Sequence, residues 1–142
     1  MSIKLSSKNR ASTIARNKYY KDLDLGLRVH PGLLDIRPLE DIEAVKNSVK
    51  NLVMTGGGDR PFHPEIGSSV FNYLFELGNN WTALGIQSAI KKVLDIYEPR
   101  IDRVSVEVID QLDRNSYFIT IGFRVKAPNI ATEVNFYLER LR

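Results

Sequence analysis

Hydrophobic residues recur with a helical period through the first two thirds of the chain. One helix is predicted over residues 39–53, because its apolar residues fall on one face while charged residues face water. A longer helix is predicted from about Trp81 to Tyr97, and Asn79 or Asn80 can cap it. A short helix is expected between them over residues 71–76, with Ser68 or Ser69 as its cap. The apolar positions of the first helix are Ile42, Val45, Val49, Leu52 and Val53, and those of the long helix are Leu84, Ile86, Ala89, Ile90, Val93, Leu94 and Tyr97. The width of the second face indicates contact with a sheet and with a further element or another chain.

From residue 104 onward the hydrophobic period changes to two, which is the period of β-strands. Turn residues separate three such runs, at residues 110–115 and 127–129. The buried sides of the runs are Val104, Val106 and Val108; Tyr117, Ile119, Ile121, Phe123 and Val125; and Val134, Phe136 and Leu138. The pattern predicts an α+β fold, in which helices cover one face of a C-terminal, three-stranded antiparallel meander. A sheet this small has open edges, to which another chain can add a strand.

A charged corner lies where the long helix meets the first of these strands. Pro99 lacks an amide hydrogen and disfavours helical conformation at the preceding residue, so the helix should end at Glu98. Such a turn needs the proline, but it needs neither Glu98 nor Arg100. Two interpretations follow: a helix stop flanked by solvated charges, which are generally weak surface pairs, or a charged pair displayed to a partner.

The glycine-rich loop at residues 55–59 does not have the features of a phosphate-binding loop. Such a loop follows a strand and ends in lysine and serine or threonine, whereas here a helix precedes and Asp59, Arg60 and Pro61 follow. We interpret it as a hinge or turn. Residues 60–67 hold two prolines and form a rigid irregular segment, which Phe62 and Ile66 are expected to anchor to the core.

Charge is distributed unevenly along the 142 residues, and the net charge of +3 hides this. The first 21 residues hold six basic residues and none of the 17 acidic ones. Residues 1–18 are therefore predicted to be an extended basic arm in front of a single domain at 19–142. Its candidate contact residues are Lys4, Lys8, Arg10 and Arg16. Three interpretations of the arm remain: it contacts an acidic protein neighbour, it binds nucleic acid phosphates, or it only increases solubility. Nucleic acid binding is the weaker interpretation, because the rest of the chain offers no basic face with interleaved aromatics.

Composition narrows the remaining functions. With no cysteine, neither a disulfide framework nor a thiolate zinc site is expected. No apolar run approaches a membrane span or a secretory signal, so a soluble protein is expected. The two histidines, His30 and His63, lie in loops without a metal-ligand pattern, so no cofactor is expected. Glu65 and Glu76 are the first carboxylate pair to test for glycan hydrolysis, although 17 acids make such a pair common by chance.

The order of these segments resembles a known family. Three segments before the terminal meander are similar to the baseplate wedge subunit of contractile-tailed phages. In chain order they are Arg60-Pro61-Phe62 with Pro64-Glu65-Ile66-Gly67, then Leu74-Phe75-Glu76, then Tyr97-Glu98-Pro99-Arg100-Ile101. This is the gene product twenty-five family, which includes the sheath-initiating baseplate component of type VI secretion systems. The resemblance runs from about Tyr20 to the C-terminus. Some members carry a lysozyme-like label, which no catalytic motif in this sequence supports.

The resemblance implies a structural role rather than an enzymatic one. Members sit in the baseplate wedge around the tail tube and start polymerisation of the sheath, so the expected partners are the larger wedge proteins and the sheath protein, with tail tube or hub proteins as further candidates. The expected location is the virion baseplate, after synthesis in the host bacterial cytoplasm. The family's Glu-Pro-Arg motif falls on Glu98, Pro99 and Arg100, which would contact the helical core bundle of the wedge by charge-assisted hydrogen bonds. Strand exchange with the sheath would use the last strand, with Val134, Phe136 and Leu138. A glycan-hydrolysing enzyme and a nucleic-acid-binding module are the alternatives.

Overall fold

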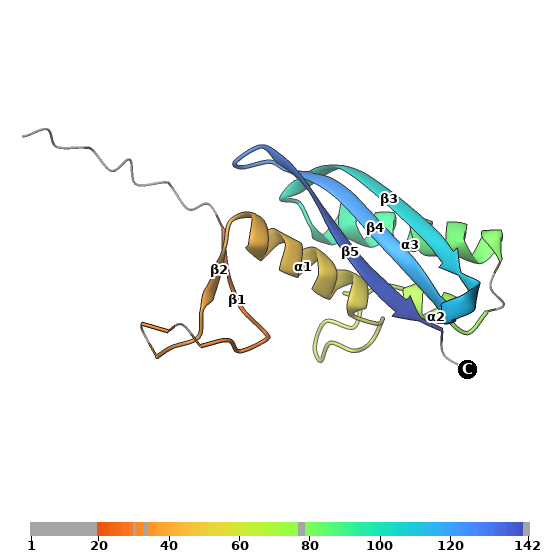
Figure 1. The fold of residues 1–142 in the computed structure, drawn as a ribbon, viewed down its shortest axis with the longest axis horizontal. Coiled ribbons are helices and arrows are strands. Elements are labelled where there is room, and N and C mark those ends of the chain that lie inside the picture. Colours follow the sequence, from red (N-terminus) through yellow and green to blue (C-terminus); the bar gives the residue numbers. More distant parts are fainter. Residues whose placement is uncertain (1–19, 30, 33, 77–78, 141–142) are drawn as a thin grey trace, which may run out of the picture.

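In the computed structural model, the residues described are 20–29, 31–32, 34–76 and 79–140. The predicted arm at 1–18 lies outside them. The elements in chain order are β1 (Lys21–Leu23), β2 (Pro38–Glu40), α1 (Ile42–Met54), α2 (Val70–Tyr73), α3 (Asn80–Tyr97), β3 (Ile101–Gln111), a 3₁₀ turn (Leu112–Arg114), β4 (Ser116–Val125) and β5 (Ile130–Glu139) (Figure 1).

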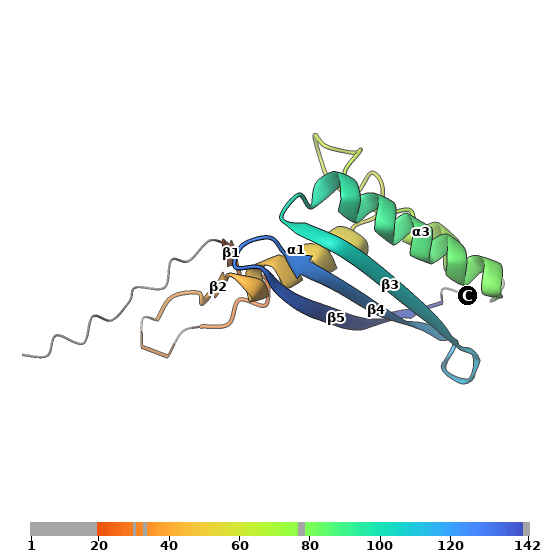
Figure 2. The same cartoon turned by 90° about the horizontal axis from the view of Figure 1, so that it is seen from above.

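Strands β3, β4 and β5 form the predicted antiparallel meander, in that order across the sheet. The two views show α1 and α3 lying along the sheet (Figures 1 and 2). Along β4 the inward residues are buried and the alternate ones are only partly covered, as expected for a sheet with one face on the core. The α+β fold is therefore confirmed.

The core lies between the sheet and the two long helices. Val45 and Val49 from α1, Ile90 from α3, and Ile119 and Ile121 from β4 are all fully buried. Each such side chain contributes roughly 1.5–3 kcal/mol relative to exposure. The predicted apolar faces are thus largely confirmed, but Leu84 is wrong: 53% of its surface is exposed, because α3 turns it away from the sheet.

Helix α1 starts later than predicted, whereas helix α3 starts at one of the two predicted caps. Helix α1 begins at Ile42 rather than Leu39, since Leu39 pairs with Asp22 in the small β1–β2 sheet. Asp41 adopts a positive φ of 51° between strand and helix. Helix α3 begins with Asn79 as its cap, whose side chain accepts a 2.8 Å hydrogen bond from the amide of Thr82, as Asn caps commonly do.

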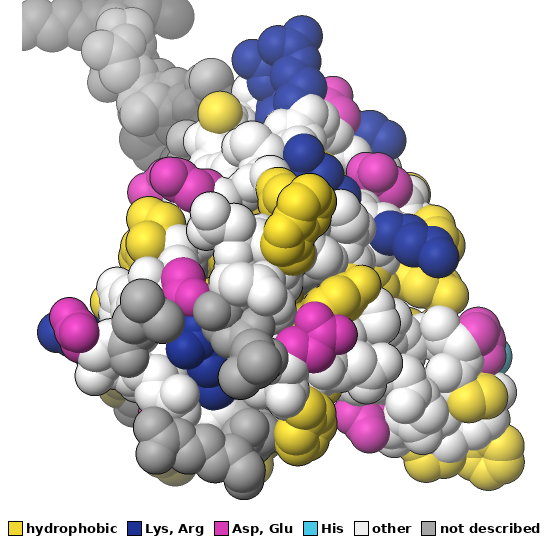
Figure 3. All heavy atoms as spheres, turned by 90° about the vertical axis from the view of Figure 1, so that its right-hand side faces the viewer, with side chains coloured by type: hydrophobic (Ala, Val, Ile, Leu, Met, Phe, Trp, Pro, Cys, Tyr) yellow, Lys and Arg dark blue, Asp and Glu magenta, His cyan; other side chains and the backbone are white. Residues whose placement is uncertain are grey.

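Hydrophobic side chains are exposed at the end of the molecule where α3 begins. Trp81 is 80% exposed at the start of α3. At the end of the molecule drawn on the right of Figure 1, hydrophobic side chains lie in separate groups among charged and polar ones (Figure 3). Scattered apolar groups are normal on protein surfaces, so this end does not identify a docking face.

Candidate functional site: the Glu98–Arg100 corner and the open edge of β5

The corner is held in place by backbone hydrogen bonds on both of its sides. The amide of Glu98 donates to the carbonyl of Leu94 and closes α3. On the strand side, the amide of Lys126 donates to the carbonyl of Arg100 at 2.9 Å, and the Lys126 ammonium donates to the carbonyl of Pro99 at 2.6 Å. Helix α3 therefore ends at Tyr97 with Glu98 as its cap, just before Pro99 as predicted, and the turn is fixed to the end of β4.

Glu98 and Arg100 form a two-point ion pair inside this corner. Arg100 Nε donates to Glu98 Oε1 at 2.6 Å, and Arg100 Nη2 donates to Glu98 Oε2 at 2.7 Å. Ser48 Oγ, on α1, donates a third bond to Oε2 at 2.7 Å. Such charge-assisted, bidentate pairs are among the stronger polar interactions in proteins.

Burial and hydrogen bonding act in opposite directions on this carboxylate. The Glu98 side chain is only 1% exposed. Burial alone would raise its pKa, but the hydrogen bonds from Arg100 and Ser48 together lower the pKa below the ordinary value of 4.5. The pKa of Arg100 is raised by its hydrogen bond to Glu98, against the opposing effect of burial. Both groups therefore carry their charges at neutral pH.

The two charged residues of the corner differ in accessibility. The Glu98 carboxylate is bonded within the chain, whereas the Arg100 side chain keeps 28% of its surface exposed. Pro99 is exposed at the tip of the turn. The Arg100 guanidinium also lies 5.5 Å from the ring centre of Tyr20, in cation–π range. The corner thus offers Pro99 and one side of Arg100 to the outside, and Glu98 orients them from beneath.

A rigid loop packs beside the corner, and its anchoring is only partly as predicted. Ile66 packs against the core, but Phe62 is 96% exposed with a positive φ of 69°; the expected anchoring by Phe62 is wrong. The loop is held instead by backbone contacts, since the Tyr97 hydroxyl donates to the carbonyl of Glu65 at 2.7 Å and residues 56 and 68 form a bridge.

The outer edge of β5 is open along its length in the part of the chain that the structure describes. Its ten residues pair with β4 in one unbroken register, from Ile130 opposite Val125 to Glu139 opposite Ser116. Just beyond that register, the amide of Arg140 bonds to the carbonyl of Asn115. Residue pairs in an antiparallel ladder alternate between hydrogen-bonded and non-hydrogen-bonded pairs. Because Arg140 bonds to Asn115, the backbone groups of the even-numbered residues of β5 bond to β4. The backbone amides and carbonyls of the odd-numbered residues point to the open edge.

This alternation assigns different parts to neighbouring residues of β5. Phe136 and Leu138 are buried, and Val134 packs partly on the core. Their backbone groups point to β4 by the same alternation. The free amides and carbonyls of the edge belong to the residues between and beside them, which are Ala131, Glu133, Asn135, Tyr137 and Glu139.

The opposite edge of the sheet, on β3, is less available to another strand. A register shift interrupts β3 between Asp102 and Ser105, where Arg103 has a positive φ of 51°. Gln87 of α3 donates a 2.6 Å hydrogen bond to the carbonyl of Val106. Bulges and covering side chains are the usual means of protecting an edge. Of the two edges, β5 is the one suited to pairing.

The residues considered for catalysis do not form a catalytic arrangement. Glu65 and Glu76 are both exposed, and Glu65 pairs with His63 at 3.1 Å. A backbone hydrogen bond and that histidine hold the pKa of Glu65 below 4.5, whereas a general acid needs a raised pKa. His30 lies outside the described residues. In the described part of the chain no group of three metal-ligating side chains occurs, and no helix is long and apolar enough to cross a membrane.

Comparison with known proteins places the chain in a structural class. Residues 39–130 match the family model of baseplate wedge protein gp25. The chain belongs to this family of structural proteins of the contractile-tail baseplate, and not to an enzyme family. The baseplate wedge protein gp25 of Enterobacteria phage T4 is 33% identical over 109 residues, which cover 77% of this chain and 82% of the phage protein.

Solved structures share the fold at lower identity. A protein from Geobacter sulfurreducens, described provisionally as a tail lysozyme, matches with a TM-score of 0.64 and 23% identity over 69% of this chain and 89% of that chain. A chain of the type VI secretion system baseplate complex matches with a TM-score of 0.58 and 18% identity over 69% of this chain and 92% of that one. These likenesses support the fold alone.

Sequence reasoning found the corner but missed the residues that support it. Ser48, Tyr20 and Lys126 converge on the corner from three other segments. Ser48 lies between Val45 and Val49 on the border of the α1 apolar face, a position that hints at a half-buried hydroxyl. Nothing in the local sequence of Tyr20 or Lys126 indicates the contact, because each depends on the tertiary fold.

Proposed function

We propose that this baseplate wedge protein initiates assembly of the tail sheath by accepting a strand at the open edge of β5. The observation that carries the proposal is the unbroken ten-residue register of β5 with β4, beside an edge left uncovered by the described residues. Long regular edges are templates for another strand. A sheath subunit that adds a strand here would bond to the outward amides and carbonyls of Glu133, Asn135 and Tyr137.

The residues Val134, Phe136 and Leu138 contribute to this strand addition from the inner side. Their side chains hold β5 on the core and so keep the edge straight before the sheath arrives. A template that is already ordered loses little further conformational freedom on binding, which favours affinity.

The second part of the proposal concerns docking within the wedge. The corner of Glu98, Pro99 and Arg100 contacts the helical core bundle of the larger wedge proteins, with Pro99 and the exposed side of Arg100 at the contact. Glu98 acts through Arg100, because its own carboxylate is already occupied by Arg100 and Ser48. Docking at the corner leaves β5 free for the sheath protein.

The basic arm and the cellular location complete the proposal. Lys4, Lys8, Arg10 and Arg16 contact an acidic neighbour in the baseplate, for which tail tube or hub proteins are candidates. The protein is made in the host cytoplasm and resides in the baseplate of the virion. If the isolated arm bound DNA in a salt-sensitive manner, the nucleic-acid interpretation would replace this one for the arm.

Hydrogen exchange tests the strand addition at single-residue level. The purified chain is measured alone and with the sheath protein of the same particle. The proposal predicts that the amides of Glu133, Asn135 and Tyr137 become protected on binding, while those of Val134 and Phe136, already bonded to β4, change little. Binding that protects α3 and leaves these outward amides unchanged would refute strand addition at β5.

A further inference from the structure

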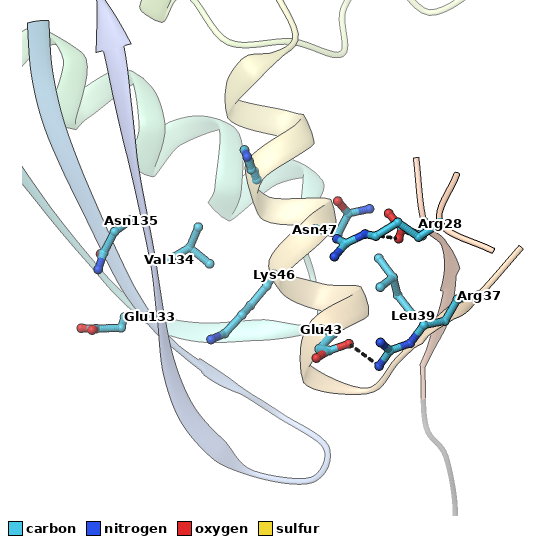
Figure 4. A pocket seen from close by; sticks show the side chains of 11 residues that line it. Arg28, Arg37, Leu39, Glu43, Lys46, Asn47, Glu133, Val134 and Asn135 are labelled. Atoms are coloured by element: carbon cyan, nitrogen blue, oxygen red, sulfur yellow. Dashed lines mark hydrogen bonds and ion pairs between the residues drawn. The ribbon is translucent and has the colours of Figure 1, made fainter. Parts of the chain in front are cut away.

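A groove lies between helix α1 and strand β5, directly beside the open edge. It has a volume of about 390 Å³ and is formed by α1, the β1–β2 segment and β5. Figure 4 shows Lys46 extending from α1 toward β5, and Val134 pointing from β5 toward α1. We call it the Lys46 groove and define it by Lys46, Asn47, Lys50, Glu133 and Val134.

Positive charge in the Lys46 groove is only partly neutralised within the chain. Arg28 is paired with Asp24 at 3.0 Å, and Arg37 with Glu43 at 3.7 Å. Lys46 and Lys50, which also line the groove, have no ion pair among the described residues.

The two lysines are also placed unfavourably with respect to one another. They are four residues apart on the same helix, where like charges repel each other. Glu133, an acid that also lines the groove, points from β5 away from α1 (Figure 4), so it does not neutralise Lys46. The groove therefore contains two lysines that have no ion pair among the described residues, and Lys46 extends toward β5, an arrangement that suits a carboxylate ligand.

We infer that the strand added to β5 carries an acidic side chain that enters the Lys46 groove and pairs with Lys46 and Lys50. This inference rests on the proposed strand addition and specifies the chemistry of the partner. In a strand paired with β5, side chains beside Val134 point to the same face as Val134, which is the face toward α1. One inward position of the incoming strand is thus an aspartate or glutamate rather than an apolar residue.

The pairing would give the sheath contact a specificity that backbone hydrogen bonds lack. Main-chain bonding accepts almost any sequence, and the side chains that fit the adjoining pockets select among sequences. A segment with a basic residue at this position would meet Lys46 and be rejected, since like-charge contacts in an interface are costly.

The test compares two charge reversals of equal size. The variant Lys46→Glu/Lys50→Glu changes the groove, and the matched control Lys91→Glu/Lys92→Glu changes exposed lysines on α3. Affinity for the sheath protein is measured for the full chain at low and high salt, with thermal unfolding to check that each variant is folded. The groove variant should bind about tenfold or more weakly than wild type at low salt, with a smaller difference at high salt, and the control should bind like wild type.

A complementary exchange confirms the position of the acid. Changing the inward acidic residue of the sheath strand to lysine should restore binding to the groove variant and weaken binding to wild type. The groove variant and the control variant could instead bind the sheath protein equally well, with the outward amides of β5 still protected. That result would reject the acidic ligand and leave strand addition intact. If the wild-type protein did not bind sheath protein at all, strand addition and the groove inference would both be rejected. In that case, DNA binding that is lost only in the groove variant would assign the groove to nucleic acid.

Discussion

Ser48 Oγ on α1 donates a 2.7 Å hydrogen bond to Glu98 Oε2 at the end of α3, although the two residues are 50 positions apart. With the two bonds from Arg100, it leaves the buried carboxylate well supplied with donors. Because α1 carries the Lys46 groove and the corner ends at β3, this bond fixes the two proposed contact surfaces in one rigid unit. The corner is therefore part of the fold and also a candidate contact site.

The first prediction is that Glu98→Gln lowers the free energy of unfolding and makes it less dependent on pH in the acidic range. The amide loses charge-assisted bonds to Arg100 and Ser48, which costs roughly 2–3 kcal/mol. Since the folded pKa of Glu98 lies below its ordinary value of 4.5, its contribution is full above the unfolded pKa and is lost as pH falls through the folded pKa.

Urea unfolding from pH 7 down to pH 3 measures this effect. Wild type should lose stability as the pH falls below 4.5, the ordinary pKa of the glutamate side chain, and Glu98→Gln should lose less over the same interval. Parallel curves for the two proteins would show that Glu98 does not contribute.

The second prediction concerns Arg100, which has both a supporting role and a proposed contact role. Arg100→Ala leaves a buried carboxylate without its cationic partner, with the neutral Ser48 hydroxyl as the remaining side-chain donor, so it should cost about 3 kcal/mol or more. The double variant Glu98→Gln/Arg100→Ala should be destabilised by less than the sum of the single changes, as a double-mutant cycle in urea would show. Strict additivity would mean that the two side chains are not coupled in solution.

The same double variant separates folding from docking. It removes the charges of the corner without leaving an unpaired carboxylate, and so should stay folded at room temperature. Mixed with the neighbouring wedge proteins, it should fail to form the complex that wild type forms, as measured by size-exclusion chromatography with light scattering. A complex of wild-type mass would exclude Arg100 as the docking residue.

The third prediction is that Gly67 cannot be replaced. A Cβ there would lie 2.4 Å from the carbonyl oxygen of Gly56, whereas a Cβ on Gly57 would meet nothing within 4 Å. Gly67→Ala should cost about 1–3 kcal/mol, as overpacking does, while Gly57→Ala should be neutral or slightly stabilising. Thermal unfolding of both variants checks this, and equal effects would mean that the close backbone approach is absent.

The fourth prediction separates two phenylalanines. Phe62 is 96% exposed and Phe123 is 3% exposed. Phe62→Ala should change the free energy of unfolding by less than about 0.5 kcal/mol, whereas Phe123→Ala should cost about 3–5 kcal/mol. A large loss of stability in the Phe62 variant would restore the anchoring role that its sequence context suggested.

The sequence predicted the strands best, because burial alternates every two residues along β4 and β5; the start of β3 at Ile101 was missed, where a register shift interrupts the alternation. It also located the turn at Pro99, since proline acts on its own backbone and on the residue before it. The start of α1 was wrong because Leu39 has apolar helical spacing but pairs with β1, a choice made by tertiary contacts. Phe62 was wrong for a related reason: hydrophobicity predicts burial only where the backbone allows the side chain to reach the core.

The site was predictable in identity but not in geometry. Glu98 and Arg100 stand two residues apart, so a pair between them could be expected. Which of the two would be buried depended on Ser48, which lies on another helix. Similarly, the period of two indicated that β5 would have an edge, whereas the bulge in β3 and the contact from Gln87 identified β5 as the more open one.

The most direct test of the account is sheath assembly on baseplates that contain an Asn135→Pro variant. Proline is tolerated on an edge strand where the amide faces outward, but it removes that amide and its ring obstructs an incoming strand. Asn135→Ala is the matched control, because it keeps the backbone amide. We predict that baseplates form with both variants and that electron microscopy shows sheath only on those with alanine. Normal sheath on baseplates with folded Asn135→Pro protein would contradict it.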